Sequence, residues 1–160
     1  MRILGSLLLL LALSSCGGPD PDQLTQAGRN QLAAGDFAAA AESFDQALAA
    51  LSDKNDKNYL NARMGRIEAW CEIDPGKARD DFLALAAESG KVTDRHFNQV
   101  GGRLGSAGNL TEAIAVLEVG KKSFPDSPHL EKLVELLGKK AEAGDPAALE
   151  ALKGLGYVGD

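Results

Sequence analysis

The chain has 160 residues, of which 17 are basic and 23 acidic, so its formal net charge is −6; 44% of the residues are hydrophobic and 5% are aromatic. We expect no nucleic-acid partner, because nucleic-acid-binding proteins concentrate positive charge and offer aromatic surfaces on which bases stack. The same acidity opposes broad adsorption to anionic lipid, and the length is that of one compact domain.

The N-terminal segment has the layout of an export signal. Arg2 provides a positive start, residues 3–13 are apolar, and Ser14 and Ser15 are the small residues that a processing peptidase requires before its cut. An apolar stretch of about ten residues is too short to cross a hydrocarbon core of about 30 Å. We therefore expect residues 1–15 to be removed as a signal peptide.

The end of this segment, Leu13-Ser14-Ser15-Cys16, resembles the lipobox of bacterial lipoproteins. The resemblance implies that the Cys16 thiol receives a diacylglyceryl group, that cleavage occurs just before Cys16, and that its freed amine takes a further acyl chain such as palmitate. Two or more chains hold a protein stably on a membrane, so Cys16 is the predicted lipidation site and residues 16–21 are the lipidated tether. The alternative is an ordinary secreted protein whose Cys16 lies near the cleavage site by chance.

The residue after the cysteine predicts which membrane carries the protein. Gly17 stands there instead of an aspartate, and in this it resembles lipoproteins that are released to the outer membrane. The predicted location is therefore the bacterial cell envelope, with the protein lipid-anchored in the outer membrane and facing the periplasm.

Beyond the tether, helical segments alternate with turns. Apolar residues such as Ala40, Phe44 and Ala47 recur at three- and four-residue steps and so share one helix face. Glycine or proline beside Asp, Asn or Ser marks the breaks. Together these patterns predict eight helices, over residues 22–34, 37–51, 58–72, 75–88, 93–106, 110–123, 128–142 and 146–153.

The second helix of each successive pair repeats one spacing. Three alanines are each followed four residues later by a large apolar residue: Ala40 and Phe44, Ala78 and Phe82, Ala113 and Leu117. With the small residues around them, which include Gly28, Gly35, Gly65, Gly101, Gly108 and Gly120, they resemble the tetratricopeptide repeat family, whose unit is a 34-residue helical hairpin. The middle copy departs from the pattern, because it is one residue longer between Gly65 and Ala78.

This resemblance implies an all-α fold, a right-handed superhelix of about three helical hairpins over residues 22–127. Helices over residues 128–153 are expected to cap the last hairpin, because a hairpin cannot close a core alone. Phe44 and Phe82 are expected to be wedged between helices. A generic helical bundle is the alternative fold.

In the tetratricopeptide family the first helices of successive hairpins line a concave groove that takes extended peptides or partner helices. Transferred position by position, the groove residues here are Thr25, Arg29, Ala62, Arg66, Asn98 and Gly102, with Arg63 and Arg95 near the rim. Arg29 and Arg66 each follow a glycine at equivalent places, which favours an acidic peptide partner held by charge-assisted bonds. The alternative is that these arginines cover helix surfaces or pair with nearby carboxylates.

The sequence offers no constellation for catalysis or metal binding. His96 and His129 are isolated, and the adjacent carboxylates of Asp80 and Asp81 point about 100° apart on a helix. Cys71 lies in an apolar helical pattern, where a buried structural thiol is the ordinary case. We therefore expect no enzymatic activity, no cofactor and no metal.

The predicted function is that of a membrane-anchored protein-interaction or scaffold module of the envelope. The C-terminal residues 154–160 include Leu155-Gly156-Tyr157, which is similar to the tail of some exported sulfatases and repeat proteins. A non-catalytic accessory subunit of an exported enzyme system is therefore one alternative, and a self-associating structural protein is another. Leu155, Tyr157 and Val158 are expected to fold back as apolar cover, with a docking tag as the alternative.

Overall fold

The computed structural model describes residues 20–51, 53–54 and 56–157. Within these ranges the chain is all-α, and each helix end lies within one residue of its predicted place. The helices are α1 (Pro21–Ala34), α2 (Phe37–Ala50), α3 (Lys57–Ile73), α4 (Pro75–Glu88), α5 (Asp94–Ser106), α6 (Leu110–Ser123), α7 (Pro128–Glu142) and α8 (Pro146–Gly154). The predicted signal peptide and the lipidation site Cys16 lie outside the described residues.

The helix ends follow from local sequence. Aspartate side chains accept a backbone N–H at the start of five of the described helices: Asp20 for α1, Asp36 for α2, Asp56 for α3, Asp74 for α4 and Asp145 for α8. Proline occupies the first turn of α1, α4, α7 and α8, where no N–H partner is needed. The Asp-Pro and Ser-Pro pairs are thus helix starts, as predicted.

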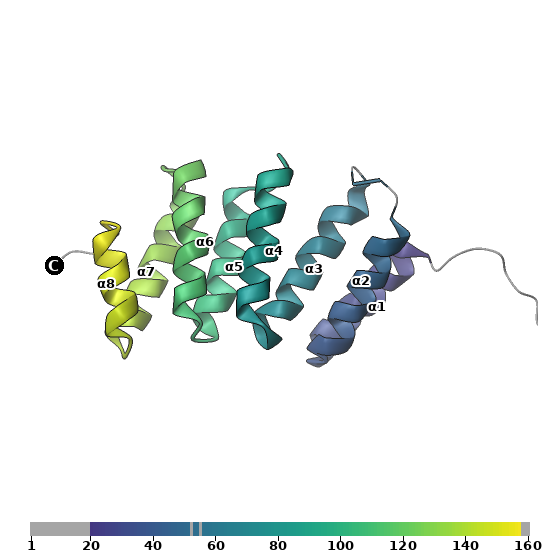
Figure 1. Ribbon diagram of the computed structural model, residues 1–160, viewed down its shortest axis with the longest axis horizontal. Coiled ribbons are helices and arrows are strands. Elements are labelled where there is room, and N and C mark those ends of the chain that lie inside the picture. Colours follow the sequence, from purple (N-terminus) through teal and green to yellow (C-terminus); the bar gives the residue numbers. More distant parts are fainter. Residues whose placement is uncertain (1–19, 52, 55, 158–160) are drawn as a thin grey trace, which may run out of the picture.

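Consecutive helices pack as pairs, and the pairs stand side by side in a row (Figure 1). The first helices of the pairs form one layer, in which α1 packs on α3, α3 on α5 and α5 on α7. In the second layer α4 packs on α6 and α6 on α8. The last pair, α7 and α8, continues both layers and covers the third hairpin, as the sequence predicted for its caps.

The row is less regular at its N-terminal end. No pair of Cα atoms from α2 and α4 lies within 8 Å, so these two second helices do not pack directly as the later ones do. A visible gap separates α2 from α4 in Figure 1, and α3 lies behind it. The first hairpin is therefore joined to the second mainly through α3.

The buried side chains form two hydrophobic clusters. The smaller one joins α2 to α3 and consists of Phe44 and the alanines Ala40, Ala41, Ala47, Ala62 and Ala69. The larger one runs from α3 to α8 and contains most of the buried leucines together with Phe82 and Phe97, whose rings meet edge to face at 4.9 Å. Phe44 and Phe82 are both fully buried, which confirms that they are wedged between helices.

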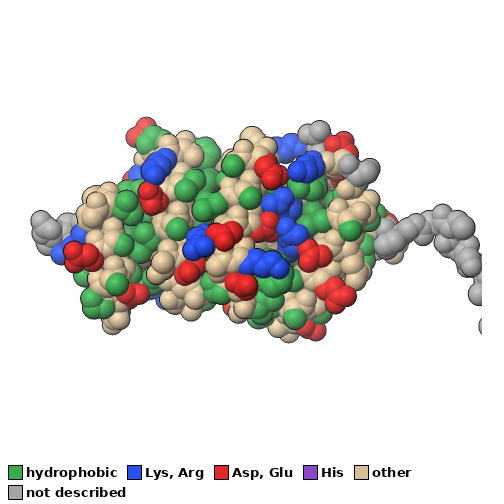
Figure 2. All heavy atoms as spheres, in the orientation of Figure 1, with side chains coloured by type: hydrophobic (Ala, Val, Ile, Leu, Met, Phe, Trp, Pro, Cys, Tyr) green, Lys and Arg blue, Asp and Glu red, His purple; other side chains and the backbone are tan. Residues whose placement is uncertain are grey.

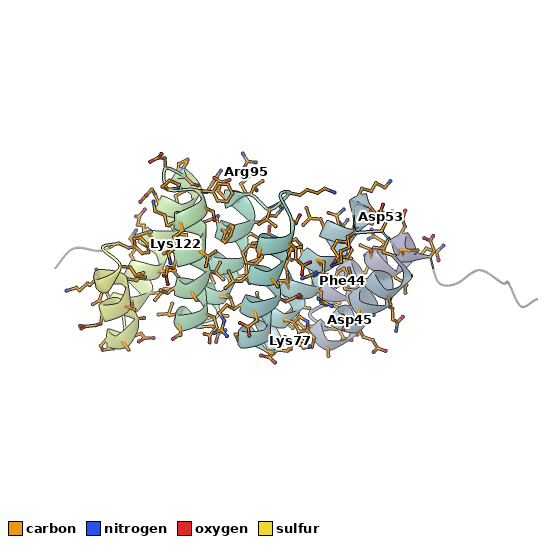
Figure 3. The ribbon with its side chains drawn as sticks, turned by 45° about the horizontal axis from the view of Figure 1, so that its top comes forward. Phe44, Asp45, Asp53, Lys77, Arg95 and Lys122 are labelled. Atoms are coloured by element: carbon orange, nitrogen blue, oxygen red, sulfur yellow. The ribbon has the colours of Figure 1, made fainter. Side chains whose placement is uncertain are left out.

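Phe44 is enclosed by two glycines from different hairpins. A Cβ atom at Gly28 of α1 would lie 2.8 Å from the Phe44 ring, and one at Gly65 of α3 would overlap the same ring. Both helices can therefore approach α2 closely only because these positions lack a side chain. Figure 3 labels Phe44 at this junction.

The C-terminal tail ends α8. Gly156 adopts φ 73°, and the next N–H, from Tyr157, bonds to the Leu152 carbonyl at 2.9 Å, which closes the helix end. Tyr157 packs on the large cluster, so the predicted fold-back is confirmed there. It is wrong for Leu155, which is 37% exposed, and Val158 lies outside the described residues.

Candidate functional site

A cavity of about 240 Å³ opens on the first-helix layer, between α1, α3 and α5. Its apolar lining comes from Leu32, Leu60, Met64 and Gly65, and its polar lining from Arg29, Asn61, Glu68, His96 and Gln99. The cavity thus lies where the first hairpin meets the second and third, beside the junction at which α2 and α4 stay apart.

The apolar lining is held in place by both hydrophobic clusters. Leu32 packs against the small cluster and Leu60 against the large one, and both are half-buried. Met64 belongs to the large cluster and is 7% exposed. Leu60 and Met64 are four residues apart on α3 and so share one face of that helix. Leu32, Leu60 and Met64 form what we call the apolar floor of the cavity, and the two hydrophobic clusters support it.

The acidic group of the cavity is already engaged. The Gln99 side-chain amide donates a hydrogen bond to the Glu68 carboxylate, and Arg103 Nη1 lies 3.8 Å from Glu68 Oε2. Arg103 also approaches Glu72, at 3.8 Å. Glu68 is therefore engaged by two residues of α5, Gln99 and Arg103, and it shares Arg103 with Glu72.

The basic group of the cavity is free. Arg29 is exposed on α1 and forms neither a hydrogen bond nor an ion pair with any residue in the described part of the chain. It lies three residues before Leu32, so its side chain and the apolar floor lie on the same face of α1. Arg29 is therefore a cation at the cavity that has no counter-ion among the described residues.

His96 has a structural partner in addition to its place in the cavity. Its Nδ1 atom accepts the Thr93 backbone N–H at 3.0 Å, which completes a capping box at the start of α5. Burial lowers the pKa of the His96 imidazole below its ordinary value, against a smaller opposing effect of Asp94. Burial therefore favours the neutral ring, and acceptance of the Thr93 N–H at Nδ1 places its proton on Nε2.

The six predicted groove residues do not form one surface. Arg29 alone among them lines the cavity. Thr25 and Ala62 are buried, and the Thr25 hydroxyl has no hydrogen-bond partner among the described residues. Asn98 is half-buried on α5, and Gly102 faces open space. The predicted lining is therefore wrong for Thr25 and Ala62.

Arg66 is also misplaced in the prediction, because it faces the second-helix layer. Its Nη1 lies 2.6 Å from Asp45 Oδ1 on α2, and its Nη2 lies 2.8 Å from Asp81 Oδ2 on α4. One arginine from α3 thus bridges the two helices that do not touch. Figure 2 shows positive and negative side chains interleaved over this part of the second-helix face.

Arg63 belongs to the same ionic cluster. Its side chain is 9% exposed, donates to Asp81 Oδ1 at 2.8 Å and donates to the Tyr59 hydroxyl at 2.9 Å. Arg95, the other predicted rim residue, is exposed at the N-terminal end of α5 and does not line the cavity (Figure 3). Arg63 and Arg66 therefore pair with nearby carboxylates, which was the alternative to binding an acidic peptide.

The reason for the error lies in how the glycines are used. Gly28 and Gly65 contact the same phenylalanine, Phe44, from two different helices. The residue after the glycine nevertheless differs in its surroundings: Arg29 on α1 lines the cavity, and Arg66 on α3 pairs with carboxylates of the second layer. The lining residues of α3 and α5 that the prediction missed follow helical steps, since Gln99 comes three positions after His96 and Glu68 seven positions after Asn61. Those steps were a usable signal.

The adjacent carboxylates Asp80 and Asp81 are paired with arginines, and the Cys71 thiol is buried. Asp80 pairs with Arg79 at 2.8 Å, and Asp81 is held in the arginine cluster. Cys71 is fully buried, and burial raises the pKa of its thiol to about 12, so it carries no thiolate near neutral pH. Over the ranges that the structure describes, no group of three or more His, Cys, Asp or Glu side chains could hold a metal ion.

None of the helices in the described part of the chain has the length and apolar character needed to cross a membrane. In comparisons with known proteins, none of the family models matches this chain, and no curated protein or solved structure matches it significantly.

Proposed function

We propose that this protein is a non-catalytic interaction module, lipid-anchored in the bacterial cell envelope, that holds a peptide or helix of a partner protein on its first-helix layer. The observation that carries the proposal is the cavity between α1, α3 and α5, with its apolar floor and the free cation Arg29. An apolar centre with a polar rim is the usual make-up of a protein-binding surface.

The resemblance to tetratricopeptide repeats supports the same conclusion. The paired helices form two layers, and the first-helix layer, which in that family binds partners, is the one that contains the cavity. The polar groups of the cavity suit recognition better than catalysis, because Glu68 is engaged by Gln99 and Arg103 and His96 Nδ1 accepts the Thr93 N–H.

The predicted anchor fits this role. Cys16 lies five residues before Pro21, the first residue of α1, so an acylated Cys16 would hold the repeats close to the membrane surface. The first hairpin, which supplies Arg29, would be the part nearest the lipid. The partner we propose is accordingly another protein of the envelope, at or near the same membrane.

The groove is tested by site-specific photo-crosslinking in intact cells. A photoreactive residue at Asn61 or Gln99, both exposed at the cavity, should crosslink one and the same partner. The control position is Glu150, exposed on α8 and remote from the cavity. If neither cavity position gave a product absent from the Glu150 control, the proposed function would be wrong.

The anchor is tested separately by fractionation. Cys16→Ser should move the protein from the membrane fraction to the soluble periplasmic fraction, because no acyl chain can then be attached. Unchanged membrane association of this variant would contradict lipidation at Cys16. The crosslinking result would still stand on its own, since it depends on the cavity alone.

A further inference from the structure

Resting on the proposed function, we infer that the cavity between α1, α3 and α5 receives one apolar side chain of an extended peptide, and that Arg29 binds a carboxylate side chain next to it. The recognised partner is therefore a segment in which an aliphatic residue such as Leu adjoins Glu or Asp. Four features of the described residues support this: the size of the cavity, its floor, its charge and its position.

The size indicates a side chain and not a whole small molecule. The cavity measures about 240 Å³, whereas pockets that enclose complete drug-sized ligands usually measure about 300–1,000 Å³. A single anchor residue seated in a pocket, with its neighbours outside, is the common way in which a peptide concentrates its binding energy.

The floor selects an apolar group. Leu32 from α1 and Leu60 from α3 approach the cavity from the two clusters, and Met64 of the large cluster lies one turn after Leu60 on α3. Methionine is unbranched and adapts to the shape of an incoming side chain. A polar anchor would lose its hydration over these three residues, whereas an aliphatic anchor would bury apolar surface on them, so an aliphatic anchor is favoured.

The charge selects the neighbour of the anchor. Glu68 lies 3.8 Å from Arg103 and receives the Gln99 amide, while Arg29 has no partner within the described chain. A carboxylate beside the anchor would give Arg29 a counter-ion and can accept two hydrogen bonds from the guanidinium. A lysine or arginine in that position would be repelled.

Arg29 and the apolar floor lie close enough for one short peptide segment to contact both. Arg29 and Leu32 lie on one face of α1, one turn apart, so an anchor side chain over Leu32 and a carboxylate at Arg29 can belong to adjacent residues of a peptide. Arg66, in contrast, is held by Asp45 and Asp81 on the opposite layer and takes no part.

The test uses the full chain, isotope-labelled and purified in detergent, and four blocked nine-residue peptides of Ser and Gly that differ only at their centre. The centres are Leu-Glu, Leu-Gln, Ala-Glu and Ala-Gln. In a titration followed by NMR, the Leu-Glu peptide should shift the signals of Met64 and His96 and bind about tenfold more tightly than either singly changed peptide. Equal binding of all four peptides would overturn the inference, as would the absence of shifts at the cavity up to millimolar peptide.

Two protein variants with the same charge change separate the contributions. Arg29→Glu should abolish the preference for Leu-Glu over Leu-Gln and leave the preference for Leu over Ala, because Arg29 touches only the carboxylate. Arg95→Glu changes an exposed arginine outside the cavity and should alter neither preference. If both variants weakened the Leu-Glu peptide equally, the effect would be one of overall charge and the assignment to Arg29 would be wrong.

The experiments distinguish a failure of this peptide inference from a failure of the proposed function. Crosslinks from Asn61 or Gln99 to a partner in cells, together with four peptides that bind equally, would retain the interaction module and reject this peptide class. Absence of both would reject both. Arg29 has no partner to lose in the described chain, so Arg29→Glu should melt like the wild type, and a thermal melt checks that its effect on binding is not caused by unfolding.

Discussion

The junction between the first and second hairpins is built differently from the junctions that follow it. Along the later pairs, second helices pack on one another and one large cluster of leucine, valine and phenylalanine side chains runs through them. At the first junction α2 and α4 stay apart, and the contacts are alanines, Phe44 and an arginine cluster.

The first junction is thus expected to be less stable than the later ones, and it is also the place where the cavity opens. Alanines let helices approach closely but bury little apolar area, and stabilisation scales with that area at about 25 cal/mol per Å². Fewer residues must then hold the junction, so each one matters more. On the other layer the same junction is where the cavity with Arg29 opens.

The largest effect is expected from Phe44→Ala. Loss of a fully buried phenylalanine costs about 3 to 5 kcal/mol, and here it removes the large side chain that fills the small cluster. Amide hydrogen exchange should show α1 and α2 losing protection before α5 and α6. Phe82→Ala, within the large cluster, should lower protection across α4 to α6 instead. Identical exchange patterns for the two variants would contradict the distinction between the junctions.

The second effect concerns the carboxylate that holds two arginines. Asp81→Ala leaves Arg63, whose side chain is 9% exposed, without its closest carboxylate, so we expect a loss of about 3 kcal/mol in urea unfolding. The matched control is the adjacent Asp80→Ala, because the Asp80 side chain is 70% exposed and its pair should contribute less than about 1 kcal/mol. Equal losses for the two variants would show that the cluster is not structural.

The third effect compares two glycines on first helices. Gly65→Ala places a methyl group against the Phe44 ring and should cost about 1 to 3 kcal/mol. Gly102→Ala meets nothing within 4 Å and should stabilise α5 by up to about 1 kcal/mol through helix propensity. Thermal melts measure both, and a destabilising Gly102→Ala would contradict the open position of Gly102.

The smallest effect is a pH dependence at the start of α5. The folded-state pKa of His96 is lowered by burial, so its contribution to stability is complete above the unfolded value of about 6.5 and is lost as the pH falls through the folded value. Protonation also ends the acceptance of the Thr93 N–H by Nδ1. Stability should therefore decrease from pH 7 toward pH 5.

The control for this pH effect is His96→Gln, since glutamine can complete the same capping box without titrating. Its unfolding free energy should change less between pH 7 and pH 5 than that of the wild type. The same slope in both proteins would assign the pH dependence to other groups.

Most of the helices could be predicted from local chemistry. The Asp-Pro pairs and the glycines at helix ends act on their own backbone neighbours, and the predicted ends were confirmed within one residue. Buried positions such as Phe44 and Phe82 followed from the spacing on one helix face. These features depend on contacts between residues close in sequence.

The candidate site could be predicted only in part. Arg29, one of the predicted groove residues, lines the cavity. Arg66 was assigned to the groove by analogy of sequence position, but it pairs with carboxylates of the second-helix layer. The use of Gly28 and Gly65 against one phenylalanine, Phe44, depends on how two helices approach α2, which the sequence does not state.

The sequence by itself determined the helices, their ends and the residues that must be buried, because hydrogen-bonded caps and a 3.6-residue period act within a few residues. Only the tertiary structure decided which of the two predicted groove arginines, Arg29 and Arg66, is free. Arg66 finds Asp81 and Asp45, which are 15 and 21 residues away, across a gap between helices, whereas Arg29 finds no partner in the described chain. Charge pairing is a property of surfaces brought together by packing, and that packing is what leaves Arg29 at the cavity as the group able to bind a partner.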